Sequence, residues 1–218
     1  MSPFLYLAAI AVPSIAIALC QSMHAGLPRL RRAPSDGVLI DGRYRNVAVN
    51  GGVALAAYVA GIVLLGGYLV DAGRTSRWYA PLLVLLLYDF GYYWLHRALH
   101  WRSLMRSVHW VHHRTSHPTA VDSLYLHPLE TVAGLVVLLA SMAAVGPLGP
   151  GAFVATAIAH SLVNVLVHAN LSIPARLAWL TNHWSARHDA HHSSSGNFGT
   201  ITPLWDWLFG TSARTQHA

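Results

Sequence analysis

Long apolar runs are the feature that most restricts what this chain can fold into. The run at 47–70 reads VAVNGGVALAAYVAGIVLLGGYLV, and a membrane-crossing helix needs about 20 such residues. Four further runs qualify or nearly qualify: 4–20, 78–95, 131–145 and 151–168. Only 10% of the residues are charged, against about a quarter in soluble domains. Because backbone groups in lipid must pair internally, we expect an all-α integral membrane protein with about four to five transmembrane helices.

The turn signals and the arginines predict how these runs are connected. GPLGP at 146–150 predicts a turn between the last two runs, which would form a helical hairpin. The chain has no lysine, and its net charge of +6 comes from arginines concentrated in 21–46, in 97–114 and in the tail. Placing these segments in the cytoplasm gives five crossings, with the N-terminus outside. The alternative is that one short run does not cross, because hydropathy does not settle short spans.

Several other classes of protein do not fit the composition. The single cysteine, Cys20, allows neither an internal disulfide nor a cysteine-based metal site. No segment resembles a basic recognition helix, so we expect no nucleic-acid partner. The run 4–20 has no basic leader and no clear cleavage site, so we interpret it as a membrane anchor. The alanine-rich, lysine-free composition suits a bacterial inner membrane.

Histidines recur at regular spacing beside the apolar runs. Three motifs carry them: HRALH at 96–100, HWVHH at 109–113 and HDAHH at 188–192. On a helix, positions 0, 3 and 4 project within an arc of about 100°. In a fourth element, HSLVNVLVH, polar residues recur every four positions: His160, Asn164 and His168. With the topology above, the three motifs lie in a cytoplasmic helical cap that carries a histidine cluster.

The number of histidines indicates more than one metal ion. Imidazole suits zinc, iron, copper and nickel, and one zinc takes about four ligands. The three motifs supply eight histidines before His168 is counted, which favours a dinuclear centre. Two alternatives remain: a zinc-dependent membrane hydrolase, although no HExxH is present, and a non-enzymatic metal-binding membrane protein. Metal transport would place ligands nearer the middle of the membrane.

The motifs together resemble the fatty acid hydroxylase / sterol desaturase superfamily over roughly residues 80–211. They follow one another in that family's order: DFGYYWLHRALH, HWVHH, HPLE, HANLSIP, HDAHH, NFG and WDWLFGT. The resemblance implies an O₂-dependent membrane di-iron oxidoreductase. It divides the chain into N-terminal membrane helices with a basic cytoplasmic loop (1–75) and a fatty acid hydroxylase-like catalytic domain (76–218).

The resemblance also implies roles for individual residues. Nine histidines would be the metal ligands: His96, His100, His109, His112, His113, His168, His188, His191 and His192. Asn164 falls where some members place another ligand, so here it would act through a bound water. His127 and His160 would be ligands or hydrogen-bond partners of ligands. Asp89, seven residues before His96, is the acid we expect to accept a hydrogen bond from a ligand histidine. The aromatic residues of NFG and WDWLFGT would pack at the membrane interface.

The implied reaction needs a substrate, O₂ and electrons. A lipid entering from the bilayer would be hydroxylated or desaturated at a C–H bond. RHDAHH followed by NFG resembles the sterol-modifying branch of the family more than the fatty acid 2-hydroxylases, and four lipid classes stay open: a sterol, a hopanoid, an acyl chain or a carotenoid. Two iron ions would be the cofactor, and zinc can replace them in recombinant protein. Because the sequence shows no haem or flavin module, we expect a separate donor, a ferredoxin or cytochrome b5-like protein with its reductase. Four arginines are placed to attract it to the cytoplasmic face, although we favour their interpretation as ordinary positive-inside charges: Arg102, Arg106, Arg114 and Arg187.

Overall fold

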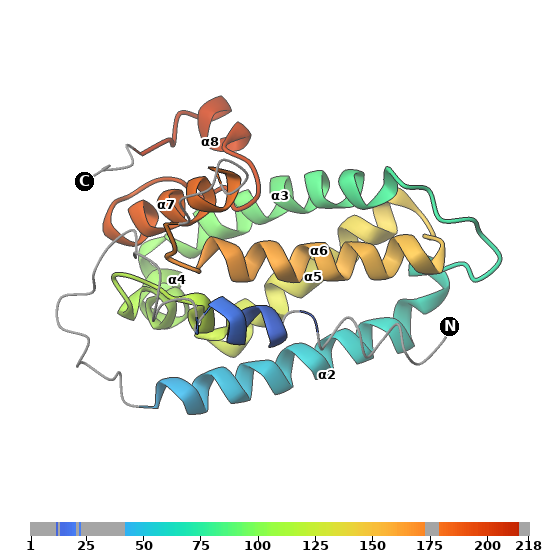
Figure 1. Cartoon of the computed structure of the whole chain (residues 1–218), viewed down its shortest axis with the longest axis horizontal. Coiled ribbons are helices and arrows are strands. Elements are labelled where there is room, and N and C mark those ends of the chain that lie inside the picture. The colour runs from blue at the N-terminus through green and yellow to red at the C-terminus, as the bar shows by residue number, and fades with distance from the viewer. Residues whose placement is uncertain (1–11, 13, 21, 23–41, 173–178, 214–218) are drawn as a thin grey trace.

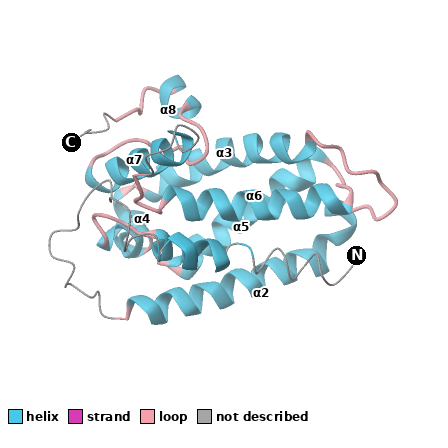
Figure 2. Cartoon of the chain, in the orientation of Figure 1, coloured by secondary structure: helices cyan, strands magenta, loops and turns pink. Residues whose placement is uncertain are grey.

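The computed structural model of this chain describes residues 12, 14–20, 22, 42–172 and 179–213. These residues form helices joined by loops (Figure 2), and an isolated β-bridge joins Val70 and Leu148. The named elements are α2 (Arg43–Leu69), α3 (Ala80–Leu99), α4 (Arg102–Ser107), η1 (His109–Arg114), η2 (Ala120–Leu124), α5 (Pro128–Val145), α6 (Pro150–Val167), α7 (Trp179–Ser193) and α8 (Leu204–Leu208). The predicted all-α class is confirmed.

Four long helices, α2, α3, α5 and α6, run alongside one another and form the body of the molecule (Figure 1). Their shared core contains fully buried side chains from each helix, including Leu69, Val84, Leu138 and Phe153. The outer face of α2 instead exposes large apolar side chains such as Val63 and Leu64. An apolar face of this kind is stable against lipid and costly against water.

Three of the described helices are long and apolar enough to cross a membrane: α2, α5 and α6. This supports a membrane protein. The expected span at 78–95 corresponds to α3, which is not among the three, and α3 carries Asp89 at its middle and His96 near its end. Most of the expected span at 4–20 lies outside the described residues. The five-crossing path and its orientation therefore stay predictions.

The predicted hairpin between the last two spans is confirmed. Helix α5 ends at Val145, and Gly146 follows with a φ of 91°, a conformation that favours glycine. Pro150 then starts α6, where a missing N–H costs no helical hydrogen bond. The Leu148 N–H donates to the Leu69 carbonyl at 2.9 Å, which ties this turn to the end of α2.

Polar contacts also join α2 to the segment that leads into α5. The buried Asn50 side chain donates to the Leu126 carbonyl at 2.7 Å and accepts from the Thr131 hydroxyl at 2.7 Å. Arg43, at the start of α2, forms an ion pair with the buried Asp122 of η2. Helix α2 is therefore packed and hydrogen-bonded onto the region after residue 75, while the proposed division of the chain at that residue stays a prediction.

The shorter helices form a cap at one end of the bundle, where α4, α7 and α8 lie together (Figure 1). HWVHH does not form the expected α-helix there, but the 3₁₀-helix η1. Helix α4 ends at Ser107 because Val108 has φ −124° and ψ −67°, outside the helical region. The chain then restarts as a six-residue turn, and 3₁₀ geometry is common in such short pieces.

Candidate metal centre

The nine predicted ligand histidines meet in the cap and form two groups. The first histidine group contains His96, His100, His109, His113 and His191, and the second contains His112, His168, His188 and His192. Within each group, one ring nitrogen from every member lies within 4.8 Å of the others. Their role as metal ligands stays a prediction, but the structure brings all nine together.

Each HxxHH motif contributes two histidines to one group and one histidine to the other, and the two motifs favour different groups. In η1, His109 and His113 join the first group and His112 joins the second. In α7, His188 and His192 join the second group and His191 joins the first. Helix α3 adds His96 and His100 to the first group, and His168, directly after α6, completes the second.

The Nε2 atoms inside each group are spaced as the corners of a metal's coordination shell would be. In the first group, His96 and His109 are 3.2 Å apart and His113 and His191 are 3.1 Å apart. In the second, Nε2 of His192 lies 3.2 Å from that of His112 and 3.0 Å from that of His188. Metal–nitrogen bonds of about 2.0–2.1 Å give corner separations of about 3.0 Å in an octahedron and about 3.4 Å in a tetrahedron.

The other ring nitrogen of six of these histidines is hydrogen-bonded to an oxygen, which is a backbone carbonyl, an obligate acceptor, in five cases and a carboxylate in the sixth. In the first group, Nδ1 of His96, His109 and His191 donates to Phe198 O (2.9 Å), to the Glu130 carboxylate (2.9 Å) and to Gly196 O (2.6 Å). In the second, Nδ1 of His112, His168 and His192 donates to Tyr125 O (3.3 Å), Asn164 O (2.7 Å) and Thr115 O (2.7 Å). Such partners fix the tautomer and the orientation of ligating imidazoles.

These hydrogen bonds decide whether the groups fit metal ions. A neutral ring that carries its proton on Nδ1 has a lone pair on Nε2. The lone pairs of His96 and His109 therefore face each other at 3.2 Å, an arrangement that is repulsive alone and attractive around a cation. The same holds for His112 and His192 in the second group. The donor set fits one metal ion in each group.

Burial keeps these rings in the form that binds metal. Desolvation, together with the neighbouring His100, lowers the pKa of His113 to about 3. Desolvation, with His112 and His113 adding to it, holds the pKa of His192 well below its ordinary value. Neutral imidazole is the ligand form of histidine, so a metal ion does not compete with a proton here near neutral pH.

The carboxylate that contacts a ligand histidine is Glu130, not Asp89 as we expected. Glu130 is buried at the start of α5, and its Oε1 atom accepts from His109. Asp89 instead accepts hydrogen bonds from residues 200–202. Seven residues correspond to about 10 Å along a helix, which explains why Asp89 shares a helix face with His96 but lies too far from it to bond.

The remaining candidate residues lie around the two groups. His127 caps α5, since its Nδ1 accepts from the Leu129 N–H at 3.2 Å. The His160 ring packs edge-on against Tyr88, with 4.5 Å between centroids. Asn164 donates to Ser123 O at 3.3 Å and lines a cavity of about 20 Å³, roughly the space of one water molecule. His96, His112, His168 and His188 also line this cavity.

The four arginines expected to attract an electron donor differ in exposure. Arg102, Arg106 and Arg114 are exposed on α4 and η1. Arg187 of α7 is largely buried and forms an ion pair with Asp206 at 2.8 Å. The expectation for Arg187 is therefore corrected, because its charge is neutralised inside the cap.

Sequence reasoning missed the oxygen atoms that hold the histidine rings. Five of the six are backbone carbonyls: Thr115, Tyr125, Asn164, Gly196 and Phe198. Any residue has a backbone carbonyl, so no residue type marks these positions. Glu130 carried a usable signal, because it stands in HPLE, one of the family-like motifs.

Fold and site together define a helical membrane protein with two histidine groups that can hold metal ions. The chain belongs to the fatty acid hydroxylase family, whose model matches residues 81–211. This confirms the resemblance seen in the sequence.

Curated relatives share about a third of the aligned residues. The chain is 32% identical over 147 residues to very-long-chain aldehyde decarbonylase GL1-11 of Oryza sativa subsp. indica, covering 63% of this chain and 53% of the relative. It is 30% identical over 164 residues to methylsterol monooxygenase 1 of Rattus norvegicus, covering 66% of this chain and 51% of the relative. It is 31% identical over 158 residues to methylsterol monooxygenase erg25A of Aspergillus fumigatus, covering 61% of this chain and 46% of the relative. The matched part spans about half the length of these relatives. No solved structure matches.

Proposed function

We propose that this protein is an O₂-dependent membrane di-iron oxidoreductase that hydroxylates or desaturates a C–H bond of a lipid. The observation that carries the proposal is the arrangement of nine histidines in two groups whose Nε2 atoms converge. Family membership and relatives named for methylsterols and very-long-chain aldehydes support a lipid substrate. A sterol- or hopanoid-like molecule is the substrate class we favour.

The nine ligand histidines would hold the irons, and the surrounding residues keep their rings aligned. When bound, the irons supply the reduction of O₂ that drives C–H oxidation. In hydroxylation, one oxygen atom enters the C–H bond and the other leaves as water, with two electrons and two protons consumed. The burial of the histidines and the small size of the cavity beside them, about 20 Å³, would limit the access of bulk water to the reacting carbon.

The position of the site favours a substrate that comes from the membrane. The histidine groups lie where α3 and α6 end and α5 begins, directly beside helices apolar enough to cross a bilayer. A lipid lying between such helices would reach the site without leaving the apolar phase. We propose that this end of the bundle faces the cytoplasm of a bacterial cell and that residues 76–218 form the catalytic region.

Electrons would come from a separate protein. Arg102 and Arg106 are exposed on α4, directly before η1 in the sequence, and Arg114 ends η1. This basic surface beside the first histidine group suits an acidic donor such as a ferredoxin or a cytochrome b5-like protein.

Metal content and turnover test the proposal together. The full chain, purified anaerobically in detergent, should contain two iron ions per chain. With a ferredoxin and its reductase, it should convert a sterol or hopanoid to an oxidised product only in the presence of O₂. A single zinc ion per chain, with hydrolysis and no oxygen uptake, would favour the zinc hydrolase. Two tightly bound metals without turnover on any lipid class would favour a non-enzymatic metal-binding protein.

A further inference from the structure

The loop between α7 and α8, residues 194–203, holds two histidines of the first group. Gly196 O accepts from Nδ1 of His191 at 2.6 Å, and Phe198 O accepts from Nδ1 of His96 at 2.9 Å. These histidines come from α7 and α3, so the loop connects two helices that are distant in sequence. Its carbonyls can orient both rings only if the loop itself is fixed in place.

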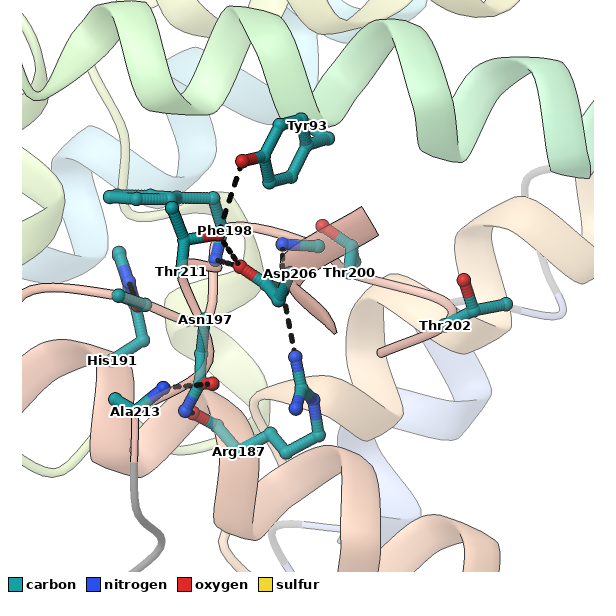
Figure 3. Close-up of polar contacts among 12 residues, drawn as sticks. Tyr93, Arg187, His191, Asn197, Phe198, Thr200, Thr202, Asp206, Thr211 and Ala213 are labelled. Carbon is teal, nitrogen blue, oxygen red and sulfur yellow. Dashed lines mark hydrogen bonds and ion pairs between the residues drawn. The ribbon is translucent and has the colours of Figure 1, made fainter. Parts of the chain in front are cut away.

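Asp206, the acid of WDWLFGT, fixes this loop from the C-terminal side. Its carboxylate is fully buried and accepts four hydrogen bonds at 2.8 Å each, as Figure 3 shows in part. Two come from the backbone N–H groups of Phe198 and Gly199, and two come from Thr211 and Arg187. A carboxylate with four donors is saturated, and the ion pair with Arg187 also ties the loop to α7.

The NFG residues have the geometry that this anchor requires. A Cβ at Gly199 would lie 2.9 Å from Oδ2 of Asp206 and 2.7 Å from Thr202 O, so only glycine allows the carboxylate to come this close. Asn197 adopts a φ of 56°. Its side chain accepts from the Ala213 N–H at 3.0 Å and donates to Arg187 O at 3.3 Å.

Asp89 fixes the far end of the same loop. Its two oxygens accept from the N–H groups of Thr200, Ile201 and Thr202. Two buried carboxylates, one on α3 and one on α8, therefore hold consecutive N–H groups along residues 198–202. This gives WDWLFGT and NFG a role beyond the interfacial aromatic packing expected from their sequence.

The second histidine group has a different set of supports. Its Nδ1 atoms donate to Thr115 O, Tyr125 O and Asn164 O, none of which belongs to the α7–α8 loop. The buried acid on that side is Asp122, which pairs with Arg43 and accepts from the Thr119 N–H at 2.7 Å. Asp122 lies in η2, the element that precedes Tyr125.

We propose that Asp206 is a positioning residue for the first metal site alone: through the α7–α8 loop it holds His96 and His191 in their metal-binding orientation. This inference rests on the proposed metal-binding role of the two groups. Because Asp206 contacts no ligand histidine itself, its effect passes through two backbone carbonyls. Loss of the anchor should weaken one metal ion and leave the other in place.

The experiment measures Co²⁺ binding to the full metal-free chain in detergent, without turnover. The wild-type chain should bind two ions, and Asp206→Asn should weaken one by about tenfold, the lower end of the range for partners of metal ligands. The matched control is Asp122→Asn, which alters the corresponding buried Asp–Arg pair beside the second group. It should weaken the other ion.

Double variants identify which ion each change affects. Adding Asp206→Asn to His191→Ala should cause little further loss, because both act on the first site. Adding it to His188→Ala should weaken the remaining ion. If Asp206→Asn destabilises the fold by leaving Arg187 unpaired, the double variant Arg187→Gln/Asp206→Asn removes both charges and is tested in the same way.

The outcomes separate this inference from the proposed function. Equal weakening of both ions, or unchanged binding in a folded Asp206 variant, would overturn the selective anchor and leave the di-metal site standing. A wild-type chain that binds fewer than two ions would overturn the proposed function itself.

Discussion

The two histidine groups share the same two HxxHH motifs but differ in number and in support. The first has five histidines, one of which, His109, donates to the buried carboxylate of Glu130. The second has four, and the three Nδ1 bonds described for it go to backbone carbonyls. Three histidines of the second group, but only His96 of the first, border the cavity that Asn164 lines. The difference teaches that two metals held here would be inequivalent: the first enclosed by nitrogen, the second with room for an exchangeable ligand.

Removing one ligand from each group should give the largest effect and test the two proposed metal sites most directly. His191→Ala in the first group and His112→Ala in the second should each lose a metal ion. The loss of metal affinity should exceed roughly 100-fold, the upper end of the range for residues that only contact a metal ligand. Both should abolish lipid oxidation, measured as product per chain alongside iron content. His183→Ala, an exposed position on α7, is the control and should keep both ions. Normal turnover by either ligand variant would refute the assignment.

Removing the carboxylate of Glu130 should weaken the first group selectively. Glu130→Ala leaves the Nδ1 proton of the buried His109 ring without its acceptor, so metal affinity at that site should fall about 10–100-fold. Glu130→Gln retains an acceptor oxygen and should fall less. Competition with a chelator measures both affinities, and the second site serves as the internal reference. If the two sites weaken together, Glu130 supports the fold and not one metal.

Reversing charge on α4 should slow electron delivery without changing either metal site. Arg102→Glu/Arg106→Glu should lower the rate of reduction by an acidic donor about tenfold at low ionic strength, with the difference shrinking as salt is added. Stopped-flow reduction at several salt concentrations measures this. Arg77→Glu, exposed before the opposite end of α3, controls for net charge when it is compared with the single variant Arg102→Glu. An equal effect from Arg77→Glu would place the donor elsewhere.

Adding a nitrogen ligand to the second group should give the smallest effect, and it tests whether the second metal site differs from the first by having room for one more ligand. Asn164 lies one helical turn before His168 on α6, so Asn164→His places a fifth imidazole beside the cavity. The second-site metal should then dissociate severalfold more slowly into a chelator, with the first site unchanged. Asn164→Ala is the control, since it empties the same position without adding a ligand. A slower first-site metal would contradict the assigned position of Asn164.

The helices and the ligand set could be predicted from the sequence, because both depend on local spacing. Apolar runs located α2, α5 and α6. The 0, 3, 4 spacing marked six of the nine histidines that meet in the cap, a spacing of four marked the other three, and the family resemblance named all nine as the ligand set. The division into two groups could not be predicted. It depends on how η1 and α7 face each other, and these elements are distant in sequence.

The supports were harder to predict for a different reason. A histidine can be recognised by its type, but Phe198 O and Gly196 O are backbone atoms whose position depends on an anchor in the following helix, Asp206. Asp89 shows the same limit. Helical periodicity placed it correctly on the face of α3 that bears His96, yet the partner that its carboxylate selects lies 111 to 113 residues later.

Each HxxHH motif is shared between the two histidine groups, and this sharing determines how the two metals would move relative to each other. Each motif contributes rings to both histidine groups from within five residues of continuous chain, so two ions bound there would be linked twice by a single turn of backbone. Sliding or tilting of the long helices in a fluctuating bilayer would move the two metal ions together. The spacing that a two-metal reaction depends on would then be insulated from the membrane in which the protein works.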